Sequence, residues 1–133
     1  SPTERGAGPS AKEGGRLEFS VPLKMNNDFR RAYRKGRSAA EPCLVVYARR
    51  NNSRTNRVGY TVSGKLGCAV VRNRVRRRLR EIYRLNESGF RRGFDLVVVA
   101  RGRSVSAEYA RLERELLRAC ASLGVLEQKE AGE

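Results

Sequence analysis

The sequence predicts a single-domain α+β fold, because helical and strand-like patterns alternate along a chain of 133 residues. The expected order is helix, two or more strands, helix, strand, helix, and the length leaves room for one modest core. Positions 1–20 are rich in Gly, Ser, Pro and charge, a composition that does not offset the entropy of ordering. We therefore expect a flexible tail at 1–20, one domain at 21–126 and a short tail at 127–133.

The first helix is expected over FRRAYRKG. The polar residues 26–28 are typical helix caps, and Gly36 provides a stop signal. Before this helix, apolar residues alternate over 17–23, which suits an extended segment. Pro22 argues against a central position for such a segment in a sheet.

The middle and the end of the chain supply strands and a last helix. Segments 43–49 and 57–62 are rich in β-branched and aromatic residues and flank the turn-rich NNSRTN, a pattern that predicts a β-hairpin. Residues 94–100, FDLVVVA, form an apolar run typical of a strand covered on both faces. A final helix is expected from the cap residue Ser106 to Gly124.

The net charge indicates a polyanionic partner. The chain has 29 Lys plus Arg and 14 Asp plus Glu, which gives +15. Positions 24–101 hold 21 basic and 5 acidic residues, and 21 − 5 gives +16 for this segment alone. Most of the cations are Arg, which binds phosphate through two parallel hydrogen bonds. A coding bias toward Arg would explain the choice of Arg but not the clustering, so we expect nucleic acid as the partner.

Residues 69–85 have the periodicity of an amphipathic helix that carries most of this charge. Four apolar residues form one stripe at helical spacing, namely Val71, Val75, Leu79 and Ile82. The face opposite the stripe consists of Asn73, Arg76, Arg77, Arg80 and Arg84. Arg72 flanks the stripe, and Arg78 lies so close to it that we expect its stem along the core and exclude it from RNA contacts.

Neither a solvated basic face nor a basic region of the leucine-zipper type fits this arginine helix well. A solvated basic face normally mixes both signs of charge, whereas Glu81 is the only acid between Arg72 and Arg84. A leucine-zipper basic region would be followed by heptads, but a strand follows here. Because like charges at i and i+4 repel, a helix of this composition calls for a polyanion.

Three aromatic residues provide a second set of candidate RNA contacts. Phe29 and Tyr33 share one face of the first helix, and Tyr47 lies in the next apolar segment. Such rings stack on unpaired nucleotides when they lie beside a basic groove. A core position explains Phe29 equally well, whereas the hydroxyl groups favour exposure of Tyr33 and Tyr47.

The remaining residue types argue against catalysis by the protein itself. Cys43, Cys68 and Cys120 form no Cys-x-x-Cys pair and the chain has no His, so neither a zinc site nor His-based catalysis is expected. The acids are scattered over the chain, which argues against an independent metal nuclease. No apolar run approaches the roughly 20 residues that span a bilayer. We expect a reduced, cytoplasmic protein.

Three segments resemble the protein subunit of bacterial ribonuclease P. They are LKMNNDFRRAYRKGRS, RVGYTVSGKLGCAVVRNRVRRRLRE, and GFDLVVVAR with the closing helix, over about 23–123. The family's RNR signature matches the run RNRVRRRLR that begins at Arg72. Two positions depart from the family pattern: Gly64 stands where a basic residue is usual, and Cys68 where Asn is common.

The resemblance implies a two-layer α/β sandwich similar to the second domain of ribosomal protein S5, with a left-handed β-α-β crossover. In that family a large catalytic RNA, with Mg²⁺ held mainly by the RNA, removes the 5′ leader of precursor tRNA endonucleolytically. The protein is a non-catalytic subunit. The implied partners are the catalytic RNA subunit and precursor tRNA, with neither DNA nor a membrane. No metal is expected to be held by the protein alone.

The resemblance and the helical wheel together assign two groups of residues. The leader cleft, between the first helix and the sheet, is assigned to Phe29, Tyr33 and Tyr47. Contacts to the catalytic RNA are expected from Lys65, Arg72, Asn73, Arg74, Arg76, Arg77, Arg80 and Arg84. Charge and size alone would also fit a structural ribosomal protein or a general RNA-binding protein.

Overall fold

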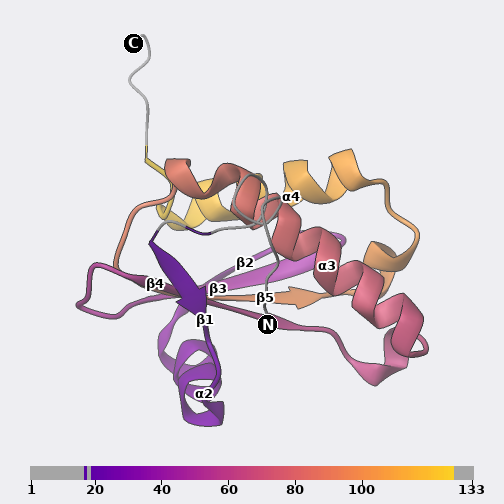
Figure 1. Ribbon diagram of the computed structural model, residues 1–133, viewed down its shortest axis with the longest axis horizontal. Helices are drawn as coiled ribbons and strands as arrows, with labels where there is room; N and C mark the ends of the chain where they lie inside the picture. The colour runs from indigo at the N-terminus through magenta and orange to yellow at the C-terminus, as the bar shows by residue number, and fades with distance from the viewer. Residues whose placement is uncertain (1–16, 18, 128–133) are drawn as a thin grey trace, which may run out of the picture.

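The computed structural model describes residue 17 and residues 19–127, which form one sheet with helices on both faces (Figure 1). Most of the two expected tails lies outside the described residues. The strand order is β1-β4-β5-β3-β2, with bounds β1 Ser20–Pro22, β2 Arg37–Ala40, β3 Leu44–Arg50, β4 Asn56–Thr61 and β5 Phe94–Ala100. The α-helices of the described part are α2 Asn26–Lys35, α3 Ala69–Asn86 and α4 Tyr109–Leu123. The mixed α+β fold is therefore confirmed.

Helices α3 and α4 cover one face of the sheet, and α2 lies on the other (Figure 1). The main core lies between the sheet and the α3–α4 layer, and a smaller cluster under α2 includes Leu23, Ala32 and Val97. No helix of the described part is both long and apolar enough to cross a membrane. The sheet thus separates two surfaces, one built on α2 and one built on α3 and α4.

Strand β5 lies between β3 and β4, so the predicted hairpin of the two earlier segments is wrong. β5 pairs antiparallel with β3 and parallel with β4. The reason is burial, because Leu96 and Val98 pack into the main core while Val97 packs under α2. An edge position would leave such a strand partly exposed. The expectation that residues 94–100 are covered on both faces is confirmed.

The parallel β4-α3-β5 unit is the crossover to which the resemblance assigns a left hand. The helix expected at 69–85 is confirmed as α3, with Val75, Leu79 and Ile82 buried. Strand β1 pairs with β4 alone, at the edge of the sheet, as the proline at position 22 requires.

Helix α2 begins three residues earlier than predicted. Met25 is its N-cap, and residues 26–28 lie inside the first turn, so their predicted capping role is wrong. The carboxylate of Asp28 is drawn into ion pairs with Arg31 and Arg57. Gly36 ends the helix as expected, but with an extended backbone. A Cβ atom there would lie 2.5 Å from the Ala32 carbonyl oxygen, so glycine is needed for close packing.

A buried ion-pair network joins α2 to the sheet. Arg57 donates from Nε and Nη2 to the two carboxylate oxygens of Asp95, at 2.8 and 2.7 Å, and from Nη1 to Asp28 at 3.0 Å. Asn51 also donates to Asp95, which is 0% exposed. The hydrogen bonds to Asp95 are the main reason why the pKa of Arg57 is raised. The network ties α2 to β4 and, through Arg57, to β5.

We expect Asp95→Asn to lower the free energy of unfolding by about 2 kcal/mol, because removing one partner leaves Arg57 poorly neutralised in a partly buried position. Urea denaturation measures the change. Glu127→Gln is the matched control, since it removes one negative charge from an exposed side chain outside the network. Equal destabilisation by the two substitutions would contradict a structural role for the network.

Candidate nucleic-acid interface

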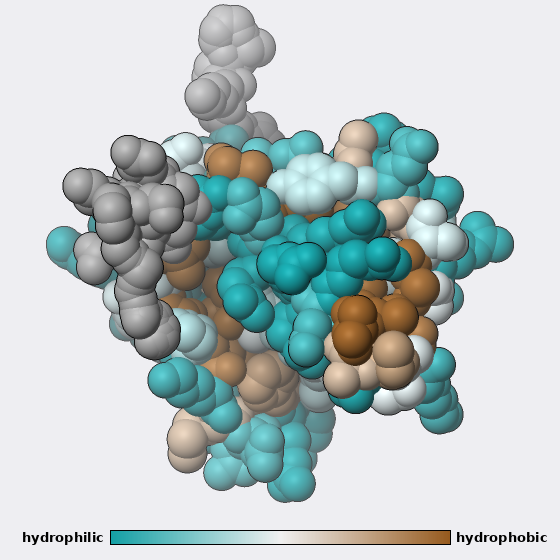
Figure 2. All heavy atoms as spheres, turned by 45° about the vertical axis from the view of Figure 1, so that its right-hand side comes forward, coloured by the Kyte–Doolittle hydropathy of each residue, from teal (hydrophilic) through white to brown (hydrophobic). Residues whose placement is uncertain are grey.

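The arginine face of α3 is oriented by the burial of its opposite stripe. Because Val75, Leu79 and Ile82 are buried, the helix cannot rotate, and its polar face points away from the sheet. Asn73, Arg74, Arg77 and Arg80 are exposed, while Arg72 and Arg76 are half-buried. In Figure 2 hydrophilic side chains gather across the middle of the molecule's face, with hydrophobic ones beside them.

Five arginines of this face keep their charge available, and we call them the free arginines: Arg72, Arg74, Arg76, Arg77 and Arg80. Within the described residues none of them forms an ion pair with a carboxylate. Arg72 donates a hydrogen bond to the Gly67 carbonyl oxygen at 3.1 Å, and Arg76 donates one to the Asn73 side chain at 3.1 Å. Because both acceptors are neutral, these hydrogen bonds leave the positive charges unneutralised. The face therefore suits an external polyanion.

Two more arginines of α3 are bonded within the protein. Arg78 donates to the Ala107 carbonyl oxygen at 3.2 Å, consistent with its expected course along the core edge. Arg84 forms an ion pair with Glu81, and its side chain is only 17% exposed. The helical wheel placed Arg84 with the exposed set, and its partner Glu81 is the neighbour three residues earlier on the same helix. An RNA contact by Arg84 stays a prediction.

The turn before α3 explains why glycine stands at position 67. Gly67 has φ +149°, and a Cβ atom there would lie 3.0 Å from the side chain of Val71. Lys65 lies in the short 3₁₀-helix Gly64–Leu66 and is exposed. Around Gly64 a Cβ atom would meet nothing within 4 Å. The family's usual basic residue would therefore fit, and glycine removes a charge without changing the packing.

The three predicted aromatic residues fall into two places. The rings of Tyr33 and Tyr47, which we call the aromatic pair, meet edge to face with centroids 5.0 Å apart. Tyr33 is 39% exposed, and its hydroxyl is 2.9 Å from the Thr61 side chain. Phe29 is half-buried, because its ring packs where a Cβ atom on Gly59 would otherwise lie.

Phe29 meets the arginine helix in a mainly apolar groove of about 390 Å³ at the β1–β4 edge. The groove brings Phe29 together with Arg76 and Arg80, whereas the aromatic pair lies apart from them. Tyr60 also lines the groove, and burial raises its pKa. Tyr60 was not among the predicted site residues, although the alternation in RVGYTV places it on the same face as Val58.

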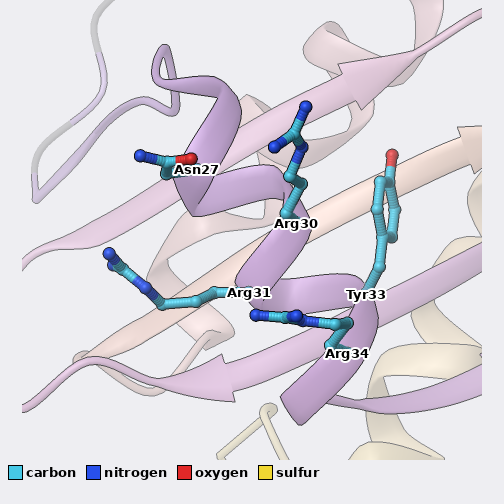
Figure 3. Close-up of a pocket in the computed structure, with 5 residues that line it drawn as sticks. All are labelled: Asn27, Arg30, Arg31, Tyr33 and Arg34. Carbon is cyan, nitrogen blue, oxygen red and sulfur yellow. The ribbon is translucent and has the colours of Figure 1, made fainter.

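A second hollow, of about 410 Å³, lies along the outer side of α2. Figure 3 shows Arg30 and Arg34 before and after Tyr33 along this helix, with Asn27 in the first turn and Arg31 pointing away from Tyr33. Arg31 pairs with Asp28, whereas no carboxylate of the described part pairs with the other two arginines. The aromatic pair is thus bordered by positive charge.

Comparison with known proteins identifies the family. A family model described as Ribonuclease P matches residues 17–124. The ribonuclease P protein component of Alkaliphilus metalliredigens is 46% identical over 101 residues, covering 76% of this chain and 91% of that protein. That of Natranaerobius thermophilus is 44% identical over 98 residues, covering 74% and 85%.

Solved structures of such proteins are also similar. The RNase P protein of Staphylococcus aureus matches with a TM-score of 0.74 and 33% identity, over 80% of this chain and 97% of that one. The Thermotoga maritima protein matches at 0.68 and 31%, over 73% and 92%. A mutant of the Staphylococcus aureus protein, described as defective in mRNA degradation activity, matches at 0.74 and 30%, over 88% and 93%.

The sheet and the arginine face of α3 define a basic, RNA-binding α+β domain. The comparisons narrow this class to one family, because the Ribonuclease P family model matches the sheet, the crossover helix α3 and α4. The chain belongs to the ribonuclease P protein family. The S5-like arrangement implied by the resemblance is consistent with these structures.

We expect Cys68, the N-cap of α3, to be the fast-reacting thiol. It is exposed, and the backbone N–H groups of Val71 and Val70 lower its pKa. Cys43 and Cys120 are buried, and burial raises the pKa of both, to about 12 for Cys120. Since the thiolate is the nucleophile, alkylation should rise with pH to a plateau whose midpoint lies below the ordinary thiol value.

Mass spectrometry of the folded protein at successive times after adding iodoacetamide measures which cysteine is alkylated first. The variant Cys68→Ser should lose the fast phase and keep only slow modification. A fast phase that persists in this variant would show that Cys43 or Cys120, and not Cys68, is the fast-reacting thiol.

Proposed function

We propose that this chain is the protein subunit of a ribonuclease P holoenzyme. In this proposal α3 binds the catalytic RNA subunit, the aromatic pair and Phe29 bind the 5′ leader of precursor tRNA, and the RNA subunit removes the leader. The observation that carries the proposal is the set of free arginines on one helix face of a chain that belongs to this family. Family membership favours it over a structural ribosomal or general RNA-binding protein.

The acidic side chains support a non-catalytic role for the protein. Asp28 and Asp95 are paired with Arg57, and Glu115 with Arg111. Among the described residues no three His, Cys, Asp or Glu side chains lie close enough together to hold a metal ion. The acids of the described part therefore form no Mg²⁺ site of their own. We assign the Mg²⁺ of the reaction to the RNA partner.

We expect the purified protein to cleave no RNA by itself and to restore precursor-tRNA cleavage at low Mg²⁺ when the catalytic RNA is added. Lys and Arg side chains neutralise RNA phosphates that would otherwise need a higher Mg²⁺ concentration for neutralisation. Gel analysis of the tRNA 5′ end measures the product. The same assay with an mRNA substrate tests the activity named for the Staphylococcus aureus protein. Cleavage by the protein with RNA rigorously excluded would overturn the division of roles.

We expect Arg76→Ala with Arg80→Ala to weaken assembly with the catalytic RNA and to reduce the salt dependence of binding, since two phosphate contacts are removed. The slope of log affinity against log salt should fall by about 0.9 per lost contact in paired regions. Filter binding at several salt concentrations measures both quantities.

We expect Tyr47→Ala to change the binding of precursor tRNA instead of assembly with the catalytic RNA. It removes one ring of the aromatic pair, so the preference for precursor over mature tRNA should fall while affinity for the catalytic RNA holds. Stacking is worth about 1–3 kcal/mol per base, which is roughly 5- to 150-fold in affinity. Equal losses for precursor and mature tRNA would remove Tyr47 from the leader contacts.

A further inference from the structure

A second group of cations surrounds a hollow at the β2–β3 edge of the sheet, which we call the edge pocket. It has a volume of about 370 Å³, and its charged lining consists of Lys35, Arg37, Arg49, Arg50 and Arg91. We propose that the edge pocket binds phosphate groups of the precursor leader, upstream of the nucleotides at the aromatic pair. The inference rests on the proposed function and extends it to a longer stretch of the leader.

The five cations come from separate parts of the chain. Lys35 ends α2, Arg37 begins β2, Arg49 and Arg50 end β3, and Arg91 precedes β5. No acidic side chain of the described residues lines the pocket, and among the five only Arg49 has a carboxylate nearby, with Asp95 at 3.9 Å. Cations gathered in this way repel one another unless an anion lies between them.

The chemistry of the lining favours phosphate over a base. The guanidinium carbon of Arg50 lies 5.6 Å from the centre of the Phe94 ring, so the exposed side of that ring is already covered. The pocket therefore presents charge and hydrogen-bond donors instead of a stacking surface. Guanidinium groups bind phosphate oxygens in a bidentate manner, which suits the backbone of an RNA strand.

The position of the pocket points to the leader as its source of phosphate. α3 packs on β4, and its Arg76 and Arg80 reach the β1–β4 edge, whereas the pocket lies at the opposite edge. The free arginines thus lie toward one edge of the sheet, whereas the pocket lies toward the other edge, beside the C-terminal end of α4.

The aromatic pair, in contrast, is close to the pocket along two elements. Lys35 follows Tyr33 by two residues on α2, and Arg49 follows Tyr47 by two residues on β3 and faces the same side. Two residues of a strand span about 7 Å, which is comparable with the spacing of successive phosphates in an RNA strand. A leader that leaves the aromatic pair around the end of α2 therefore reaches the pocket.

The experiment compares leaders of increasing length in the holoenzyme reconstituted with the catalytic RNA. The test variant is Arg37→Gln with Arg50→Gln, which removes two charges and keeps a long side chain over Phe94. The charge-matched control is Arg54→Gln with Arg114→Gln, two exposed arginines outside the pocket. Lys35→Gln with Arg91→Gln is a second, independent test variant. The dissociation constant for precursor tRNA is measured at several salt concentrations, with circular dichroism as a check on folding.

We expect wild-type affinity to rise when the leader becomes long enough to pass the aromatic pair, and both test variants to lose this increment alone. The slope against log salt should fall by about 0.7 per lost contact with a single strand, which corresponds to roughly 5-fold in affinity per contact near 0.1 M salt. The control should keep the increment, and short-leader precursor, mature tRNA and the catalytic RNA should bind the test variants as they bind wild type.

Four results would overturn the assignment of the edge pocket. Equal losses for short and long leaders would mean that the pocket contacts another part of the substrate. Weaker binding of the catalytic RNA would make that RNA the source of phosphate, and no loss at all would leave the pocket a solvated surface. A wild-type protein that restores cleavage but gains nothing from a longer leader overturns the pocket and leaves the proposed function standing. Failure to restore cleavage overturns the proposed function itself.

Discussion

The burial of β5 on both faces is the constraint from which the arrangement of the other elements follows. Leu96 and Val98 need a cover on one face and Val97 on the other, so β5 lies between β3 and β4. Helix α3 must then cross from β4 to β5 over one face, while α2 closes the other. The same burial that stabilises the sheet thus sends the arginine helix and the aromatic pair to different surfaces.

Charge is divided between arginines that hold the fold and arginines that remain available. Arg57 is bound by two carboxylates, and Arg84, Arg111 and Arg118 each have one partner. Because the chain has 14 acids and 29 cations, most of the cations cannot be paired in this way. The free arginines and the edge pocket hold much of the surplus. Their mutual repulsion opposes folding and favours any state in which a polyanion is bound.

Features set by local spacing were predictable from the sequence, and features set by distant partners were not. The stripe of α3, the course of Arg78 and the covered strand at 94–100 follow from periodicity and composition. The hairpin prediction was wrong because NNSRTN indicates a turn but does not determine which strands pair. Asp28 was misjudged as a helix cap because its ion pairs, above all the one with the distant Arg57, outweighed its capping preference.

One strand sets the distance between the two candidate RNA contacts. Gly59 and Tyr60 are neighbours on β4, so the Cα hydrogen of Gly59 and the side chain of Tyr60 point to opposite faces of the sheet. At Gly59 the missing side chain lets the Phe29 ring approach from α2, and Tyr60 lines the groove with Arg76 and Arg80 of α3. Any side chain at position 59 would have to displace Phe29. Since a strand in the middle of a sheet is rigid, a leader held on α2 and an RNA held on α3 would be kept in a fixed relation, which is what a subunit that aligns two RNAs requires.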